Sequence, residues 1–185
     1  MRLEFANIGL LLNSNKTNIT AFGNTNQSAA AVEITLDNNI VSAVPFAKFL
    51  GITIDDKLDY KQHISLLLNK LYSSLFVIRR LSRVCPKEVV IQAFHSIVMS
   101  HIEYGILAWG TASKSNLDAV LRLQKRGIRH IQGIGVRESC RDHFRSLGIL
   151  TAPSLFIYRS VLHVRSKALK ETPDATITST VKDPA

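Results

Sequence analysis

The residues best suited to chemistry are cations that gather on predicted helical faces. One group lies near the end of an apolar-striped segment that begins after Tyr60, and the other recurs at helical spacing between residues 115 and 131. The two groups are Arg79, Arg80 and Arg83, and Arg122, Lys125, Arg126 and Arg129. The second group covers roughly 100° of the side opposite an apolar stripe, and no acidic side chain falls within it. An exposed helix face usually mixes both signs, so these faces predict contacts with phosphates.

The charge of the whole chain is distributed unevenly in the same direction. Residues 1–59 hold four basic and six acidic side chains, or −2, whereas residues 60–170 hold eighteen and five, or +13. A concentrated positive surface favours a polyanion partner such as nucleic acid. The alternative is a basic surface that serves only solubility.

No other residues form a convincing catalytic or metal site. His95 and His101 have no ligand partner at useful spacing, so we expect core or rim histidines and no metal. Cys85 and Cys140 are far apart, which favours a reduced intracellular protein over a disulfide. The start of the chain has no secretory signal pattern, and polar residues interrupt its longest apolar stretch, residues 89–109, so we expect no membrane span.

The first part of the chain, residues 1–59, is predicted to be a small antiparallel β-rich unit. Short strands are expected at 10–12 and 19–22, with Lys16 on the turn between them, where a solvated loop lysine is the simpler interpretation. A hairpin is expected from strands 32–36 and 40–44 around Asp37-Asn38-Asn39. Residues 47–55 are typical of a strand, and Gly51 inside it indicates a bulge or a close backbone approach.

Residues 60–171 are predicted to be mainly helical, and residues 172–185 a disordered tail. Apolar residues at helical spacing predict helices from Tyr60, from Pro86, over 115–131, over 140–147 and over 154–169. Between the second and third helices, Tyr104 and Trp109 are expected to be buried with their polar tips bonded, with base stacking as the alternative. The predicted fold class is therefore α+β, with a β-rich unit followed by a helical bundle.

Three stretches follow one another along the chain: Gly9-Leu-Leu-Leu-Asn13-Ser-Asn-Lys16-Thr17; Phe49-Leu-Gly-Ile-Thr-Ile-Asp55 with Leu58 and His63; and His101-Ile-Glu-Tyr-Gly105 with Trp109-Gly110 and Leu123-Gln-Lys-Arg126. In this order they resemble reverse transcriptases of non-LTR retrotransposons, above all the jockey-like elements of arthropods. The resemblance covers about residues 5–165.

The resemblance implies roles for several residues. Lys16 resembles the lysine proposed to protonate the pyrophosphate leaving group, and Phe49, Leu50 and Gly51 resemble the primer-grip hairpin at the end of the palm. The helices beyond resemble the thumb, so the seven cations above become phosphate contacts to an RNA or DNA template-primer. Such contacts strengthen binding to nucleic acid without selecting a particular nucleotide sequence.

The departure from the family is as informative as the match. The intact polymerase requires Mg²⁺, held by aspartates that include a Tyr-Ala-Asp-Asp strand, and this sequence contains no such strand. Asp55-Asp56 follows the Phe-Leu-Gly turn, where the family places no metal. We therefore expect a truncated reverse transcriptase that binds template-primer but is inactive alone, with no cofactor of its own and the missing polymerase portion as a further partner.

Two alternatives remain open at this stage. The chain could be a stand-alone basic helical nucleic-acid-binding protein, or a helical interaction module for an acidic protein. The sequence shows no clear nuclear import signal, so it does not decide between a nuclear and a cytoplasmic location of the protein.

Overall fold

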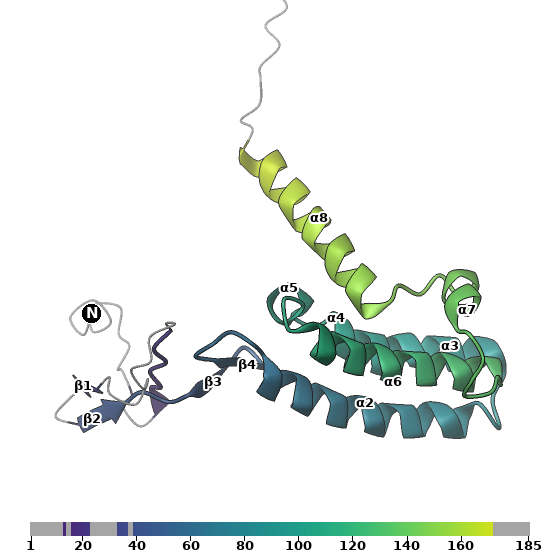
Figure 1. The fold of residues 1–185 in the computed structure, drawn as a ribbon, viewed down its shortest axis with the longest axis horizontal. Coiled ribbons are helices and arrows are strands. Elements are labelled where there is room, and N and C mark those ends of the chain that lie inside the picture. The colour runs from purple at the N-terminus through teal and green to yellow at the C-terminus, as the bar shows by residue number, and fades with distance from the viewer. Residues whose placement is uncertain (1–12, 14–15, 23–32, 37–38, 172–185) are drawn as a thin grey trace, which may run out of the picture.

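Two β-hairpins precede a bundle of helices in the computed structural model (Figure 1). The structure describes residues 13, 16–22, 33–36 and 39–171. The α+β fold class predicted from the sequence is confirmed. The strand predicted at 10–12 and the tail predicted at 172–185 lie outside the described residues.

The first hairpin forms where the sequence predicts it. Strand β1 (Glu33–Leu36) pairs antiparallel with β2 (Asn39–Ser42), and Glu33 lies opposite Ser42. Of the strand predicted at 19–22, the structure retains one parallel bridge between Ile19 and Ala43.

The single strand that the residue pattern predicted at 47–55 is wrong. The segment is a second antiparallel hairpin, as the resemblance implied for Phe49, Leu50 and Gly51, and it is formed by β3 (Phe46–Phe49) and β4 (Ile52–Asp55). Leu50 and Gly51 connect the strands with φ angles of 45° and 79°. Two successive positive φ angles are typical of a tight type I′ turn, which reverses the chain where a bulge would only bend it. Leucine is a rare residue at such a position, which explains why the turn resembled a continuous strand.

A short loop held by Asp55 connects this hairpin to the first long helix. Leu58 and Tyr60 both have a φ of 55°, which is unfavourable for residues with a side chain. The Asp55 carboxylate accepts hydrogen bonds from the backbone N–H groups of Lys57 at 3.1 Å, Asp59 at 3.0 Å and Tyr60 at 2.7 Å. These bonds hold the loop in its strained conformation and fix the point where the helix begins.

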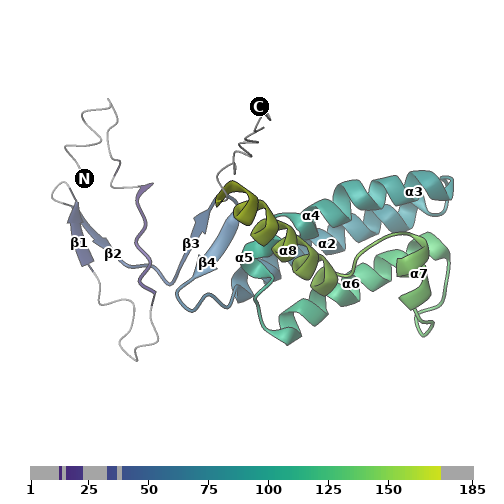
Figure 2. The same cartoon turned by 90° about the horizontal axis from the view of Figure 1, so that it is seen from above.

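The helices follow the predicted apolar stripes. They are α2 (Lys61–Leu81), α3 (Lys87–Phe94), the π-helical η3 (His95–Met99), α4 (Ser100–Glu103), α5 (Ile106–Trp109), α6 (Lys114–Gln132), α7 (Arg141–Ser146) and α8 (Ala152–Glu171). Helices α2 and α6 pack side by side, and α3, η3 and α4 run on in one direction (Figures 1 and 2). Helix α8 starts two residues before the predicted 154, so Pro153 lies in its first turn, where proline is tolerated.

The core lies between α2, α6 and the α3–α5 segment. Its largest fully buried side chains include Trp109, Phe94 and Leu71. Gly127 on α6 allows Phe94 to approach, because a Cβ at this glycine would lie 2.3 Å from the Phe94 ring. The outer half of α8 projects away from the bundle (Figure 1). None of the described helices is long and apolar enough to cross a membrane.

Candidate nucleic-acid interface

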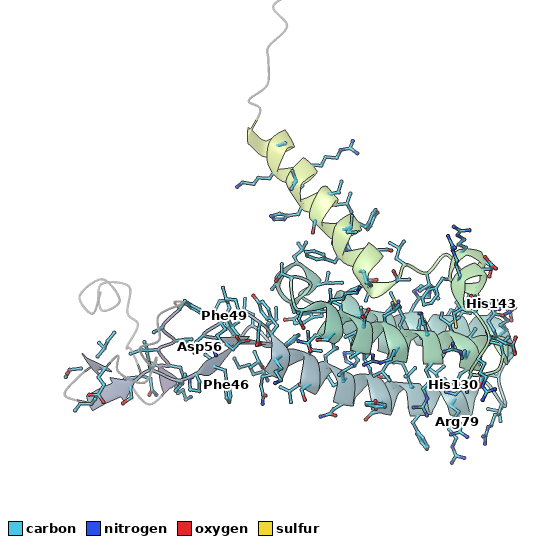
Figure 3. The ribbon with its side chains drawn as sticks, in the orientation of Figure 1. Phe46, Phe49, Asp56, Arg79, His130 and His143 are labelled. Atoms are coloured by element: carbon cyan, nitrogen blue, oxygen red, sulfur yellow. The ribbon has the colours of Figure 1, made fainter. Side chains whose placement is uncertain are left out.

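Three of the seven predicted phosphate contacts converge at the end of the α2–α6 pair. Arg79 belongs to the last turn of α2, Arg83 follows that helix, and Arg126 lies on α6. All three are exposed. All three act on His130, whose pKa is lowered first by burial and then by the positive charges of Arg126, Arg79 and Arg83. Figure 3 shows Arg79 and His130 close together. We call these four residues the seam surface.

Arg80 and Arg122 extend the positive surface away from the seam. Arg80 lies on the outer side of α2, with its guanidinium 5.6 Å from the centre of the Phe76 ring. Arg122 is exposed on α6, one turn before Arg126. None of these arginines forms an ion pair with another described residue; the ion pair that the described chain does form joins Arg159 to Glu103 at 2.7 Å. Their charges are therefore uncompensated within the described part of the chain.

The remaining two cations of the predicted face point toward a different region. Lys125 and Arg129 are half-buried and line a pocket next to α7. Arg129 donates from Nη2 to the Glu138 carbonyl at 3.1 Å, so it also braces the loop before α7. The sequence predicted one basic face on this helix, whereas the structure divides that face between an open surface and a pocket.

The second hairpin exposes the residues that resemble a primer grip. Phe49 and Leu50 are 64% and 73% exposed at the turn. The Leu50 carbonyl accepts a hydrogen bond from the Tyr104 hydroxyl at 2.5 Å, and a Cβ at Gly51 would lie 3.2 Å from that hydroxyl oxygen. The predicted close approach to the Gly51 backbone is thus present, and the neighbour is a side chain of this protein.

Tyr104 and Trp109 each bond their polar tip to a backbone carbonyl, but the two side chains differ in burial. Trp109 is fully buried and donates from Nε1 to the Tyr104 carbonyl at 2.9 Å, as predicted. Tyr104 is 56% exposed, so its predicted burial is wrong. Its ring leaves the core to lie over the hairpin turn.

A histidine anchors the other side of the hairpin. His63 on α2 accepts the Thr53 N–H on Nδ1 at 3.3 Å, and the pKa of His63 is lowered by burial and by the charge of Lys70. His63 also lines a pocket of 590 Å³ between the hairpin and α2, together with His101, which is half-buried as a rim histidine. His95 is exposed.

The acidic pair Asp55-Asp56 does not fit a magnesium site. Both Asp55 carboxylate oxygens already accept backbone N–H groups of the loop before α2. Within the described ranges, no three His, Cys, Asp or Glu side chains come together as a metal site. Lys16 is exposed on a turn closed by its N–H to the Asn13 carbonyl at 3.1 Å, and no described hydrogen bond connects it to the second hairpin.

Sequence reasoning missed His130 on α6 and two arginines that line the pocket beside α7. Arg141 and Arg145 lie four residues apart on α7 and line the same pocket as Lys125. Their spacing places both on one face of a helix, which is the signal that could have identified them.

Comparisons with known proteins agree with the motif resemblance. The chain is 26% identical over 129 residues to the RNA-directed DNA polymerase from mobile element jockey of Drosophila melanogaster. It is 29% identical over 126 residues to a probable RNA-directed DNA polymerase from transposon BS of the same organism. These matches cover 67% and 66% of this chain but 14% of each relative, so the chain spans a small part of the relatives' length. No family model matches, and no solved structure matches. Along about two thirds of its length, the chain is therefore similar to a segment of the RNA-directed DNA polymerases of non-LTR retrotransposons.

Proposed function

We propose that this chain binds the template-primer duplex of a non-LTR retrotransposon reverse transcriptase and grips it through the end of the α2–α6 pair. The observation that supports this most directly is the seam surface, where Arg79, Arg83 and Arg126 converge around His130. Exposed arginines without carboxylate partners attract phosphates, and each phosphate they neutralise releases a counterion from the duplex.

The second hairpin supports a role at the primer strand. Its turn presents Phe49 and Leu50 as exposed apolar side chains, while Tyr104 and His63 fix its backbone from two sides. A rigid turn with exposed side chains can hold a strand end in one place. Lys16 stays a candidate leaving-group acid through the resemblance alone.

The same proposal predicts no DNA synthesis by this chain on its own. Two-metal phosphoryl transfer requires carboxylates that are free to hold magnesium, and Asp55 is engaged with its own loop. Primer extension by the purified chain would contradict this prediction.

The central experiment is charge reversal at the seam surface. The triple variant Arg79→Glu, Arg83→Glu and Arg126→Glu should weaken binding to an RNA–DNA duplex. Because about 0.9 counterions are released per phosphate, the slope of log affinity against log salt should decrease by about 2 to 3. A control with equal charge change, Lys57→Glu, Lys114→Glu and Arg165→Glu, removes exposed cations elsewhere. A salt response that is flat in the parent chain, or equal in both variants, would refute the proposal.

A spectroscopic measurement tests the same surface without mutation. Burial and, after it, the charges of the neighbouring arginines lower the pKa of His130, and bound phosphates would screen those charges. The pKa of His130, followed by NMR, should therefore rise when duplex is added.

A polyglutamate competitor provides the test of the alternative acidic protein partner: displacement of duplex by polyglutamate at equal charge concentration would favour that alternative.

A further inference from the structure

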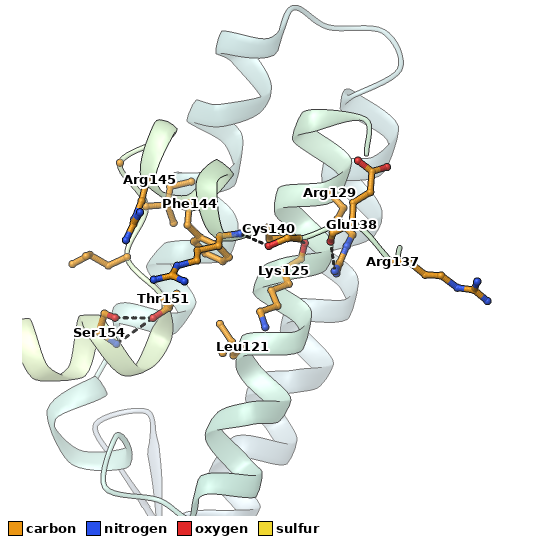
Figure 4. Close-up of a pocket in the computed structure, with 15 residues that line it drawn as sticks. Leu121, Lys125, Arg129, Arg137, Glu138, Cys140, Phe144, Arg145, Thr151 and Ser154 are labelled. Carbon is orange, nitrogen blue, oxygen red and sulfur yellow. Dashed lines mark hydrogen bonds between the residues drawn. The ribbon is translucent and has the colours of Figure 1, made fainter. Parts of the chain in front are cut away.

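A pocket of 760 Å³ lies between α6, α7 and the first turn of α8 (Figure 4). Two chemically different sets of side chains contribute to its lining. The apolar set, called the apolar part below, is Leu121, Phe144, Ile149 and Leu150. The cationic set is Lys125, Arg129, Arg137, Arg141 and Arg145. The view in Figure 4 shows Lys125 and Arg145 on different sides of the pocket and Arg137 pointing away from it.

Among the described residues that line this pocket, five are cations and one is a carboxylate. Glu138 is the acid in its lining, and its Oε1 accepts the Gly135 N–H at 2.7 Å, which commits it to the loop. Lys125, Arg141 and Arg145 form no ion pair within the described part of the chain. The beginning of α8, a helix of 20 residues, adds the positive end of its dipole at the same place.

We propose that this pocket binds a single nucleotide unit, with its phosphate between Lys125 on one side and Arg141 and Arg145 on α7, and its base against the apolar part. The proposal rests on the nucleic-acid-binding function above, because Lys125 lies on the same helix as Arg126 of the seam surface. Guanidinium groups bind phosphate oxygens in pairs, which gives such a cluster its preference for phosphate. The volume falls within the range of about 300–1,000 Å³ that is usual for small-ligand sites.

The shape and lining of the pocket favour an unpaired nucleotide over a duplex. Bases within a duplex are stacked and paired, so they cannot reach an apolar lining, whereas an unpaired base can lie against protein side chains. The seam surface and the pocket would then bind different parts of one nucleic acid: the seam surface contacts the duplex, and the pocket contacts an unpaired nucleotide beside it.

The test compares two ligands and two double variants of the full chain. A short single-stranded RNA and a blunt RNA–DNA duplex of the same sequence are titrated by fluorescence anisotropy. The pocket variant is Lys125→Gln with Arg145→Gln, and the matched control is Lys114→Gln with Arg165→Gln, which line no part of the pocket. We expect the pocket variant to bind single-stranded RNA about tenfold more weakly, with a salt slope smaller by about 1.4, and to bind the blunt duplex unchanged.

The possible outcomes separate this inference from the proposed function. Equal losses for both ligands, or no loss for either, overturn the pocket. If the seam-surface variant still binds duplex normally while the pocket variant binds single-stranded RNA more weakly, the proposed duplex role is overturned and the pocket proposal is retained. If uridine monophosphate competes with single-stranded RNA and inorganic phosphate does not, the pocket also binds a free nucleotide. If neither competes but the pocket variant still weakens single-strand binding, the pocket binds a nucleotide only as part of a strand. Equal competition by inorganic phosphate and uridine monophosphate overturns the role of the apolar part.

Discussion

The side chain of Gln124 on α6 bonds to the backbone of Leu150 and of Ala152, the two residues on either side of Thr151 at the start of α8. Its Nε2 donates to the Leu150 carbonyl at 2.7 Å, and its Oε1 accepts the Ala152 N–H at 3.0 Å. Gln124 is fully buried, so these bonds satisfy polar groups that water cannot reach. The Ala152 N–H belongs to the first turn of α8, where no helical partner exists. Gln124 is also part of the Leu123-Gln-Lys-Arg126 stretch that resembles the retrotransposon enzymes.

Replacing Gln124 with leucine should destabilise the protein by about 2–4 kcal/mol, because it leaves the buried Ala152 N–H and the part-buried Leu150 carbonyl without this partner. Urea unfolding measures the change. Gln92→Leu on the exposed side of α3 is the matched control and should change the free energy of unfolding by less than about 0.5 kcal/mol. Equal stability of the two variants would show that α8 does not depend on this side chain.

Tyr104→Phe should loosen the turn of the second hairpin while leaving the bundle intact. The variant loses the hydroxyl bond to the Leu50 carbonyl, for an overall cost of about 0.5–1 kcal/mol. Amide hydrogen exchange at Gly51 and Ile52 should become faster, while the amides of α6 keep their protection. Tyr158→Phe, at another exposed tyrosine, is the control. Unchanged exchange at the turn would mean that the strand pairing alone holds it.

Gly127→Ala should destabilise the chain even though alanine is the better helix former. Intrinsic propensity favours alanine by about 1 kcal/mol, but the added Cβ would lie 2.3 Å from the Phe94 ring and 2.9 Å from Leu75. We expect a net loss of about 1–3 kcal/mol from overpacking. The double variant with Phe94→Leu should recover part of that loss. A stabilised single variant would contradict the packing described for α2, α3 and α6.

Acid should weaken the fold partly through His63. Its folded-state pKa lies below the unfolded value near 6.5, so below that pH the unfolded chain takes up a proton that the folded chain resists. Stability should therefore fall as pH decreases from 7.5 toward 5.5, and protonation would also remove the acceptor for the Thr53 N–H. His63→Gln should show a smaller pH dependence, measured by urea unfolding. His163→Gln, at an exposed site on α8, should retain the parent's dependence.

Periodic features of the chain were predictable, and single exceptional residues were not. The helices could be located because their apolar stripes repeat over several turns, so one misjudged residue does not hide them. The second hairpin depends on one leucine in a left-handed conformation, a choice that residue statistics disfavour. The first hairpin was found because asparagine and aspartate favour such turns.

The candidate interface shows the same contrast between what periodic patterns predict and what they do not. Helical spacing identified the cations of α2 and α6, but it could not show that the end of α2 would meet Arg126 or that Lys125 would face α7. Those relationships depend on how the helices pack. Gln124 was hidden for a different reason, since a glutamine within an amphipathic pattern resembles a surface residue until the partner backbone is known.

The corner between α4 and α5 has a consequence for how the chain folds during synthesis. Its Tyr104 bonds to Leu50, 54 residues earlier, and the neighbouring Glu103 pairs with Arg159, 56 residues later. Because a ribosome adds about 5–20 residues per second, residue 159 is made several seconds after the hairpin. The hairpin turn therefore gains its bond to Tyr104, and the corner its ion pair with α8, only after those later residues have been made. Chaperones that bind apolar segments would meet Phe49 and Leu50 before the rest of the bundle exists.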